Sequence, residues 1–142
     1  MDIKNREGKL SISFKKIADR VRMQNLPDFD LVIGIATGGI VPASLLAYHL
    51  KCDFEVVRVN YRDDNNKPLY EKPLLISPFM AAIPFNTQIL IVDDVSVTGF
   101  TLDLVKNIFN NYKVKTLVLK GKADYVLFPE ISNCVHWPWK FD

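Results

Sequence analysis

Cysteine is scarce in this sequence. The chain of 142 residues contains only Cys52 and Cys134, too few for the disulfide framework that stabilises many small secreted domains. We expect reduced thiols in a reducing compartment rather than a bridge between the two, and therefore predict a cytoplasmic protein. A chain of this length buries a sizeable core without such cross-links, so we predict a single domain over residues 1–142.

An excess of charge of one sign is also missing. Lys and Arg number 18, Asp and Glu number 16, and the formal net charge is +2. Proteins that bind nucleic acids present clustered basic residues, and no such cluster is visible along the sequence, so we expect no nucleic-acid partner. The first seven residues alternate in charge with no apolar stretch behind them, which argues against a secretory signal.

Long uninterrupted apolar runs are absent as well. Residues 31–50 and residues 73–92 contain no Asp, Glu, Lys or Arg, but glycines, prolines and polar side chains interrupt both windows. A membrane-spanning helix needs about 20 predominantly apolar residues. We therefore predict no membrane segment, and we attribute the missing charge to burial inside a folded domain.

Apolar runs alternate with helical patterns along the chain. Ser13, followed by apolar residues at helical spacing, predicts an N-capped helix that ends near Asn25. Further helices are predicted over 43–51, behind Pro42, and over 101–112. Strands are predicted at 31–35, 54–59, 89–92 and 116–119, and the polar segment 60–73 predicts an exposed loop.

Strands separated by helices predict an α/β fold with a parallel twisted sheet and helices on both faces. Sheets of this kind bind ligands in the crevice at the carboxyl ends of their strands. We therefore expect the functional site just after residues 35, 59, 92 and 119.

The segment 89–102 carries the sharpest motif, an apolar strand that leads to Asp93 and Asp94 and then to a turn entering a helix. Backbone N–H groups at such a helix start, with hydroxyls from Thr98 and Thr101, form a phosphate cradle, and Gly99 permits close backbone approach. Two adjacent carboxylates need donors or a cation between them, which sugar hydroxyls or Mg²⁺ would supply. The alternative is an ordinary helix start with two acids.

This strand, acid pair and Thr-Gly-x-Thr loop resemble the phosphoribosyl-diphosphate motif of type I phosphoribosyltransferases, most closely the small xanthine-guanine and hypoxanthine enzymes. The resemblance implies a Rossmann-like fold with a small C-terminal hood, Mg²⁺ as cofactor, and phosphoribosyl diphosphate and a nucleobase as partners. It implies transfer of the 5-phosphoribosyl group to a purine-type base in nucleotide salvage. It also implies a homodimer, because family members commonly form one.

The same resemblance assigns residue roles. Asp93 and Asp94 would hold the ribose hydroxyls, Asp94 would bind the metal, and both would act in catalysis with Tyr61 in a mobile lid. The phosphoribosyl and 5′-phosphate set comprises Asp93, Asp94, Ser96, Val97, Thr98, Gly99, Phe100 and Thr101. The pyrophosphate loop comprises Thr37, Gly38 and Gly39, a sequence that by itself is equally typical of a tight turn. The base set comprises Lys120, Cys134 and Val135, with Asp124, Tyr125 and residues 135–139 in the hood.

Three positions depart from the family pattern. Val97 stands where 6-oxopurine enzymes have a proton-accepting Asp, Cys134 replaces a stacking aromatic residue, and Thr37 replaces a basic residue. Val97 and Cys134 leave the acceptor base open and favour an alternative, a sensor or regulator that binds phosphoribosyl diphosphate or a nucleotide without turnover. A phosphorelay receiver domain fits less well, because its acid pair follows the first strand and this pair follows the third.

Overall fold

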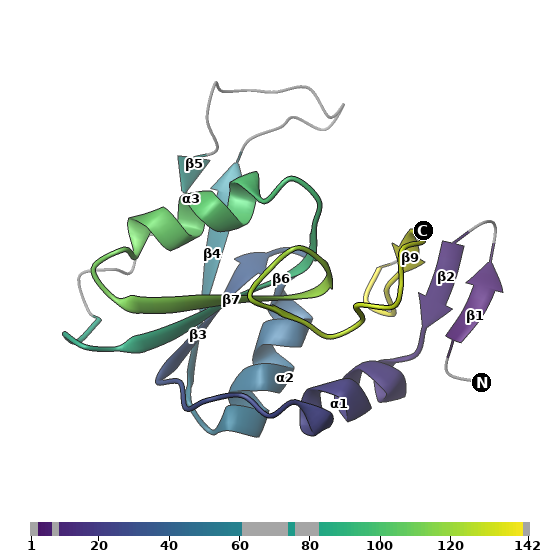
Figure 1. The fold of residues 1–142 in the computed structure, drawn as a ribbon, viewed down its shortest axis with the longest axis horizontal. Helices are drawn as coiled ribbons and strands as arrows, with labels where there is room; N and C mark the ends of the chain where they lie inside the picture. The colour runs from purple at the N-terminus through teal and green to yellow at the C-terminus, as the bar shows by residue number, and fades with distance from the viewer. Residues whose placement is uncertain (1–2, 7–8, 61–73, 76–82, 141–142) are drawn as a thin grey trace.

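The computed structural model describes residues 3–6, 9–60, 74–75 and 83–140, and its body is a sheet in the order β5-β4-β3-β6-β7-β8 (Figure 1). The strands are β3 (Leu31–Ala36), β4 (Asp53–Asn60), β5 (Leu74–Leu75), β6 (Gln88–Ser96), β7 (Lys113–Gly121) and β8 (Tyr125–Val126). Neighbouring strands are parallel from β4 to β8, and only the short β5 pairs antiparallel, with β4. The predicted parallel α/β sheet is confirmed.

Helices cover both faces of this sheet, with α3 on one face and α1 and α2 on the other (Figure 1). Their bounds are α1 (Phe14–Met23), α2 (Ile40–Leu50) and α3 (Phe100–Ile108). One hydrophobic cluster joins Ile17 of α1 and Leu46 of α2 to Leu90 of β6, and a second joins Val105 of α3 to Ile91. Because successive side chains of a strand point to opposite faces, β6 is buried on both, which explains its continuous apolar sequence.

The helix boundaries follow local chemistry. The Ser13 hydroxyl accepts a hydrogen bond from the Lys16 N–H at 3.1 Å, which confirms the predicted N-cap of α1. Helix α2 begins at Ile40, so Pro42 lies in its first turn, where no N–H needs a helical partner. The prediction of a helix to residue 112 was wrong, because α3 ends at Ile108 and a turn closed by the Tyr112 N–H and the Phe109 carbonyl leads into β7. In the described ranges, every helix is too short or too polar to cross a membrane.

The central strand β6 is longer than the sequence indicated. We predicted its end at Val92, whereas the strand continues to Ser96 and pairs with β7 as far as Gly121. Pairing to a long neighbouring strand overrides the low strand propensity of Asp. Asp93 and Asp94 therefore lie inside the strand, and the connection to α3 is only Val97–Gly99.

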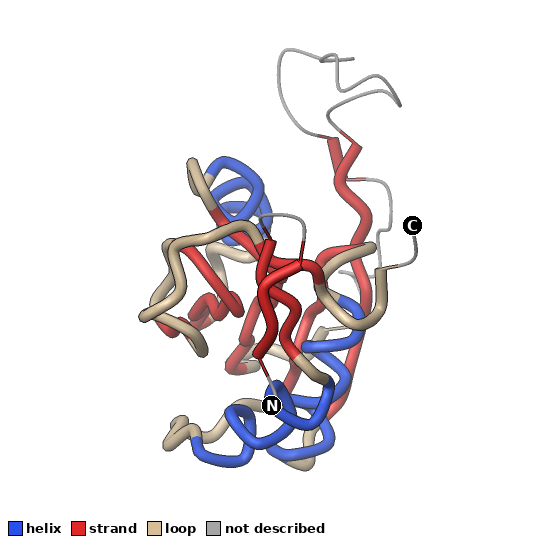
Figure 2. Tube along the Cα trace, turned by 90° about the vertical axis from the view of Figure 1, so that its right-hand side faces the viewer, coloured by secondary structure: helices blue, strands red, loops and turns tan. Residues whose placement is uncertain are grey.

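A second, smaller sheet closes one side of the molecule. It contains β1 (Ile3–Arg6), β2 (Lys9–Ile12) and β9 (Val135–His136), with β2 antiparallel to β1 and parallel to β9. This sheet lies on the right-hand side of Figure 1, the side that faces the viewer in Figure 2. Trp137, the residue that follows β9, is 1% exposed and stacks on Trp139 with ring centroids 5.7 Å apart. The predicted C-terminal hood is thus built from both ends of the chain.

Candidate functional site

The turn after β3 and the acidic end of β6 lie against each other at the carboxyl edge of the sheet. A Cβ added at Gly38 would lie 2.3 Å from Asp94 Oδ2, and a Cβ added at Gly39 would lie 2.4 Å from the Val92 carbonyl oxygen. Real side chains do not approach so closely, so only glycine allows the loop to pack on the carboxylate and on the strand. The structure therefore brings Asp94 together with the predicted loop Thr37–Gly39.

The two carboxylates are held by backbone donors of their own strand. Asp93 Oδ1 accepts from the Asp94 N–H at 2.8 Å, and Asp94 Oδ1 accepts from the Val95 N–H at 2.7 Å. The ammonium group of Lys140, from the end of the hood, lies 3.7 Å from Asp94 Oδ2. Burial, and next the negative charge of Asp94, raise the pKa of Asp93 from 3.8 to about 8, against a smaller lowering by Lys140. In the absence of ligand, one acid of the pair thus holds a proton at neutral pH.

This raised pKa predicts a pH-dependent stability. The folded chain binds a proton at Asp93 that the unfolded chain has lost, so the contribution is fully present below pH 3.8 and disappears as pH rises through about 8. Asp93→Asn keeps the shape without the charge, and we expect its melting temperature to exceed that of the wild type by a margin that grows between about pH 5 and about pH 9. Thermal unfolding across this range measures it. A difference in melting temperature between the two proteins that stays constant across this pH range would contradict the assignment.

The predicted phosphate loop leads directly into α3. Gly99 adopts φ 85° at the N-cap, a left-handed conformation that favours glycine, and the Phe100 N–H donates to Thr98 Oγ1 at 3.4 Å. The remaining N–H groups of the first helical turn suit an anion. Ser96, which we also placed in this loop, lies instead at the end of β6 with its carbonyl bonded to the Lys122 N–H at 3.0 Å.

The predicted base-binding residues do not all meet. Lys120 and Val97 line a cavity of about 390 Å³ between the ends of β6 and β7 and the segment after β8. Cys134 and Val135 are not among its lining residues: Cys134 is exposed with its carbonyl bonded to the Leu10 N–H, and Val135 pairs with Leu10 of β2 and packs on the core. Tyr61, the predicted lid residue, lies outside the described residues.

Sequence reasoning missed two features around the site. Lys140 carried no signal, because its neighbour Asp94 is distant in the sequence. Asp124, which we grouped with the base-binding hood, instead holds β7 and β8 together: its carboxylate accepts from the Thr116 N–H at 2.9 Å, and its own N–H donates to the Thr116 hydroxyl at 3.0 Å. Asp124 is therefore a structural residue in this fold.

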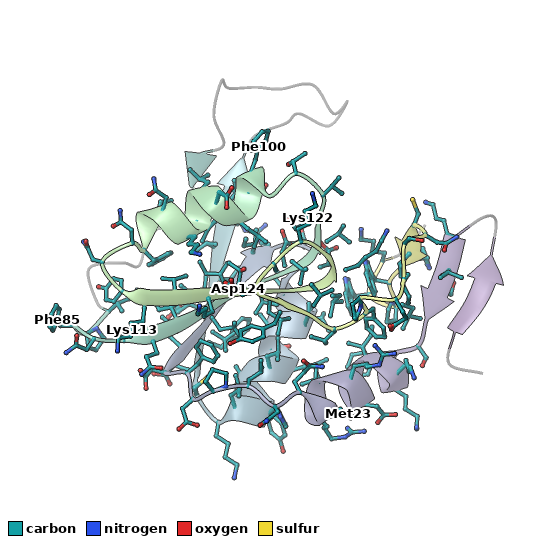
Figure 3. The ribbon with its side chains drawn as sticks, in the orientation of Figure 1. Met23, Phe85, Phe100, Lys113, Lys122 and Asp124 are labelled. Carbon is teal, nitrogen blue, oxygen red and sulfur yellow. The ribbon has the colours of Figure 1, made fainter. Side chains whose placement is uncertain are left out.

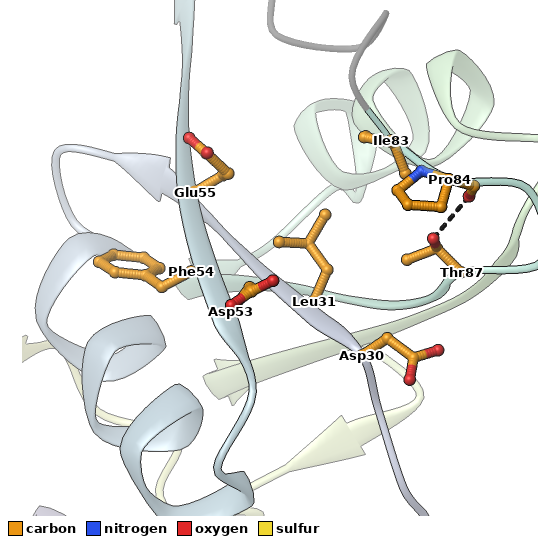
Figure 4. Close-up of a pocket in the computed structure, with 8 residues that line it drawn as sticks. All are labelled: Asp30, Leu31, Asp53, Phe54, Glu55, Ile83, Pro84 and Thr87. Atoms are coloured by element: carbon orange, nitrogen blue, oxygen red, sulfur yellow. Dashed lines mark hydrogen bonds between the residues drawn. The ribbon is translucent and has the colours of Figure 1, made fainter.

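Another cavity, of about 360 Å³, opens at the opposite, amino-terminal edge of the sheet (Figure 4). Three acidic side chains line it. Asp30 directly precedes β3, and Asp53 and Glu55 lie in the first residues of β4. Asp30 Oδ2 already accepts from the Gln88 N–H at 2.8 Å, and the Thr87 hydroxyl donates to the Pro84 carbonyl. This cavity is separate from the acid pair, because β6 carries Asp93 and Asp94 towards the other edge.

Comparison with known proteins extends these observations. A family model described as phosphoribosyl transferase domain matches residues 9–140. The transcriptional regulator GfcR of Archaeoglobus fulgidus is 30% identical over 93 residues, which cover 65% of this chain but only 46% of that regulator.

Two solved structures share the fold over nearly their whole length. The purine phosphoribosyltransferase of Pyrococcus horikoshii superimposes with a TM-score of 0.72 at 24% identity and covers 95% of this chain and 96% of its own. The Helicobacter pylori xanthine-guanine-hypoxanthine phosphoribosyltransferase gives a TM-score of 0.66 at 17% identity, covering 91% and 92%. The similarity of these two structures to the chain is one of fold.

Proposed function

The chain belongs to the phosphoribosyl transferase domain family, and on that premise we propose that it transfers the 5-phosphoribosyl group of phosphoribosyl diphosphate to a nitrogenous base, with release of diphosphate. A purine-type base is the proposed acceptor, and nucleotide salvage the proposed role. The proposal assigns the sugar to Asp93 and Asp94, the 5′-phosphate to the loop 97–101, and the leaving diphosphate to Thr37, Gly38 and Gly39.

The contact between Gly38 and Asp94 carries the proposal. It places the backbone N–H groups of Thr37 and Gly38 beside a carboxylate at the end of the central strand, while the Gly39 N–H is donated to the Ile35 carbonyl at 2.8 Å. Phosphoribosyl diphosphate has its diphosphate and its ribose hydroxyls on adjacent carbons, so it needs an anion site and an acidic site side by side. The N-terminus of α3, after Gly99, offers a second anion site for the 5′-phosphate.

These groups favour the reaction chiefly by position and charge. Breaking the bond between ribose C1 and diphosphate builds positive charge on the sugar, which nearby carboxylates stabilise, while N–H donors of the loop stabilise the leaving group. The ribose hydroxyls would donate hydrogen bonds to the carboxyl oxygens of Asp93 and Asp94. A nitrogen of the base then forms the new bond to C1 and loses its proton to solvent or to the diphosphate, and the electron pair of the broken bond leaves with the diphosphate.

The acid pair also fits Mg²⁺ as cofactor. Within the described part of the chain no group of three or more His, Cys, Asp or Glu side chains is arranged to enclose a metal, and Mg²⁺ typically uses one or two carboxylates together with substrate phosphates and water. We assign Asp94 as the protein ligand. When bound, the ion would neutralise the charge that develops on the diphosphate.

A sensor or regulator of the same fold is the second candidate function. The similarity to a transcriptional regulator favours it, as does the exposed Cys134 at the position of a stacking aromatic residue. Such a protein would bind phosphoribosyl diphosphate or a nucleotide through the same acid pair and loops, and it would release no diphosphate.

Two measurements separate these functions. Isothermal titration with phosphoribosyl diphosphate and Mg²⁺ should show saturable binding, and an absence of binding would exclude both. A panel of purines and pyrimidines, assayed for diphosphate release, then distinguishes them: turnover with any base supports the transferase, whereas binding without turnover supports the sensor. The cytoplasmic location and the homodimer are proposed from the sequence and the family resemblance, and light scattering at several concentrations tests the dimer.

A further inference from the structure

Lys140 lies where the hood meets the acid pair, and its backbone is fixed there. Its N–H donates to the Trp137 carbonyl at 3.1 Å, which closes a turn directly after β9. Trp137 is buried and stacks on Trp139, and β9 is itself paired with β2. Because this turn is anchored in the core, the side chain of Lys140 starts from a defined point within reach of the acid pair.

The ammonium group of Lys140 and the glycine loop meet at one oxygen atom. Lys140 Nζ lies 3.7 Å from Asp94 Oδ2, and Gly38 packs against the same oxygen so closely that a Cβ would not fit. Among the ion pairs of the described residues, only that of Lys140 involves the acid pair. The loop 37–39 contains no charged side chain, so an anion that rests on this loop has the ammonium group of Lys140 as a neighbour.

The ion pair between Lys140 and Asp94 is loose enough to open. Its separation of 3.7 Å exceeds the length of about 2.8 Å that is usual for a charge-assisted hydrogen bond. The side chain of Lys140 is 54% exposed, whereas that of Asp94 is 14% exposed. Ion pairs with an exposed partner contribute little to stability, and lysine carries its charge on a flexible stem. The ammonium group can therefore move to a stronger anion beside it at little cost.

We infer that Lys140 is a substrate-binding residue that exchanges one anion for another. In the free protein its ammonium group balances Asp94, and in the complex it binds the diphosphate of phosphoribosyl diphosphate, which leaves Asp94 to the metal and the sugar. The inference rests on the proposed function and adds a residue to it. It predicts that the acid pair binds a divalent cation weakly until a diphosphate draws Lys140 away.

This exchange keeps opposite charges together before and after binding. Asp94 is paired with Lys140 in the free protein, and the diphosphate, which carries several negative charges, takes over the ammonium group in the complex. The diphosphate gains further negative charge as its bond to ribose C1 breaks. An ammonium group against it therefore stabilises the transition state more than the bound substrate.

Two probes test the inference separately: inorganic diphosphate without metal, and Mn²⁺, as a stand-in for Mg²⁺, without diphosphate. In Lys140→Met the affinity for diphosphate should fall roughly ten- to hundredfold, because a charged hydrogen-bond donor is lost. The affinity for Mn²⁺, followed by electron paramagnetic resonance, should rise about two- to fivefold, because the competing cation beside Asp94 is gone. A merely structural role of Lys140 would weaken both ligands together, and that result would overturn the inference.

A conservative variant and a matched control accompany this measurement. Lys140→Arg should retain most of the diphosphate affinity, because a guanidinium group keeps the charge and binds phosphate oxygens. Lys113→Met, at the end of β7 that lies far from the hood (Figure 3), should change neither affinity. An equal loss of diphosphate affinity in Lys113→Met would show a general effect of charge and would overturn the inference.

The complete substrate distinguishes a failure of the inference from a failure of the proposed function. Titration with phosphoribosyl diphosphate and Mg²⁺ should show binding to the wild type and weaker binding to Lys140→Met, with the two melting temperatures within a few degrees. Equal affinities of the two proteins would overturn the inference and leave the proposed function intact. Absence of binding to the wild type would overturn the proposed function itself.

Discussion

Asp94→Asn is expected to reduce phosphoribosyl diphosphate binding or turnover by about 10²–10³-fold while leaving the fold intact. The amide oxygen of Asn still accepts the hydrogen bond from the Val95 N–H, now made to Asp94 Oδ1 at 2.7 Å. The substitution removes only the negative charge, which faces Gly38 on one side and Lys140 at 3.7 Å on another. That charge is the group we assign to Mg²⁺ and to the sugar.

Asp53→Asn is the matched control for this experiment. Asp53 is exposed at the start of β4, at the amino-terminal edge of the sheet. Both variants should keep the wild-type melting temperature within a few degrees, and only Asp94→Asn should lose binding in the titration. Full binding by Asp94→Asn would show that the site lies elsewhere.

Gly39→Ala is expected to lose stability, whereas Gly38→Ala is expected to lose phosphoribosyl diphosphate binding, although the two residues are neighbours. At Gly39 the new methyl group would lie 2.4 Å from the Val92 carbonyl oxygen and 2.7 Å from that of Ile35. Both are backbone atoms of central strands and cannot move aside, so we expect a loss of about 3 kcal/mol or more in the free energy of unfolding. At Gly38 the three atoms nearest to the methyl group all belong to the carboxylate of Asp94, the end of a side chain that can rotate away.

Gly38→Ala should therefore retain most of its stability and lose phosphoribosyl diphosphate binding. Denaturant unfolding and titration of the two variants separate these effects. If Gly38→Ala acts by displacing Asp94, it should have little further effect on binding in the Asp94→Asn background, because the two changes then disable the same group. Additive losses would show that Gly38 contributes independently, through its own N–H.

The alternating order of elements could be predicted from the sequence because local periodicity reports it. The four predicted core strands and three helices are present, and each charge-free window contains a buried strand segment: residues 31–50 form β3, the glycine turn and α2, and residues 73–92 finish inside β6. Burial on both faces of a parallel sheet excludes charge, which leaves a pattern that is readable without coordinates.

The candidate site was only partly predictable. The acid pair and the glycine turn are contiguous motifs, and their placement at strand ends follows from the parallel topology. Lys140 was not predictable, since it reaches Asp94 only after the hood has folded back over the sheet. The length of β6 was missed for the same reason: its last residues are held by pairing with β7, which lies farther along the chain.

The sequence by itself therefore determined the α/β class, the order of the core elements, and the two motifs that carry the proposed chemistry, because each depends on residues close together in the chain. Only the tertiary structure decided which side chains share a cavity. It placed Lys120, Lys122 and Val97 around one pocket and left Cys134 outside it, since the backbone of the β9 region is bonded to β2 at the other end of the chain. Contacts between distant segments depend on packing and strand pairing over the whole domain, and no local pattern records them.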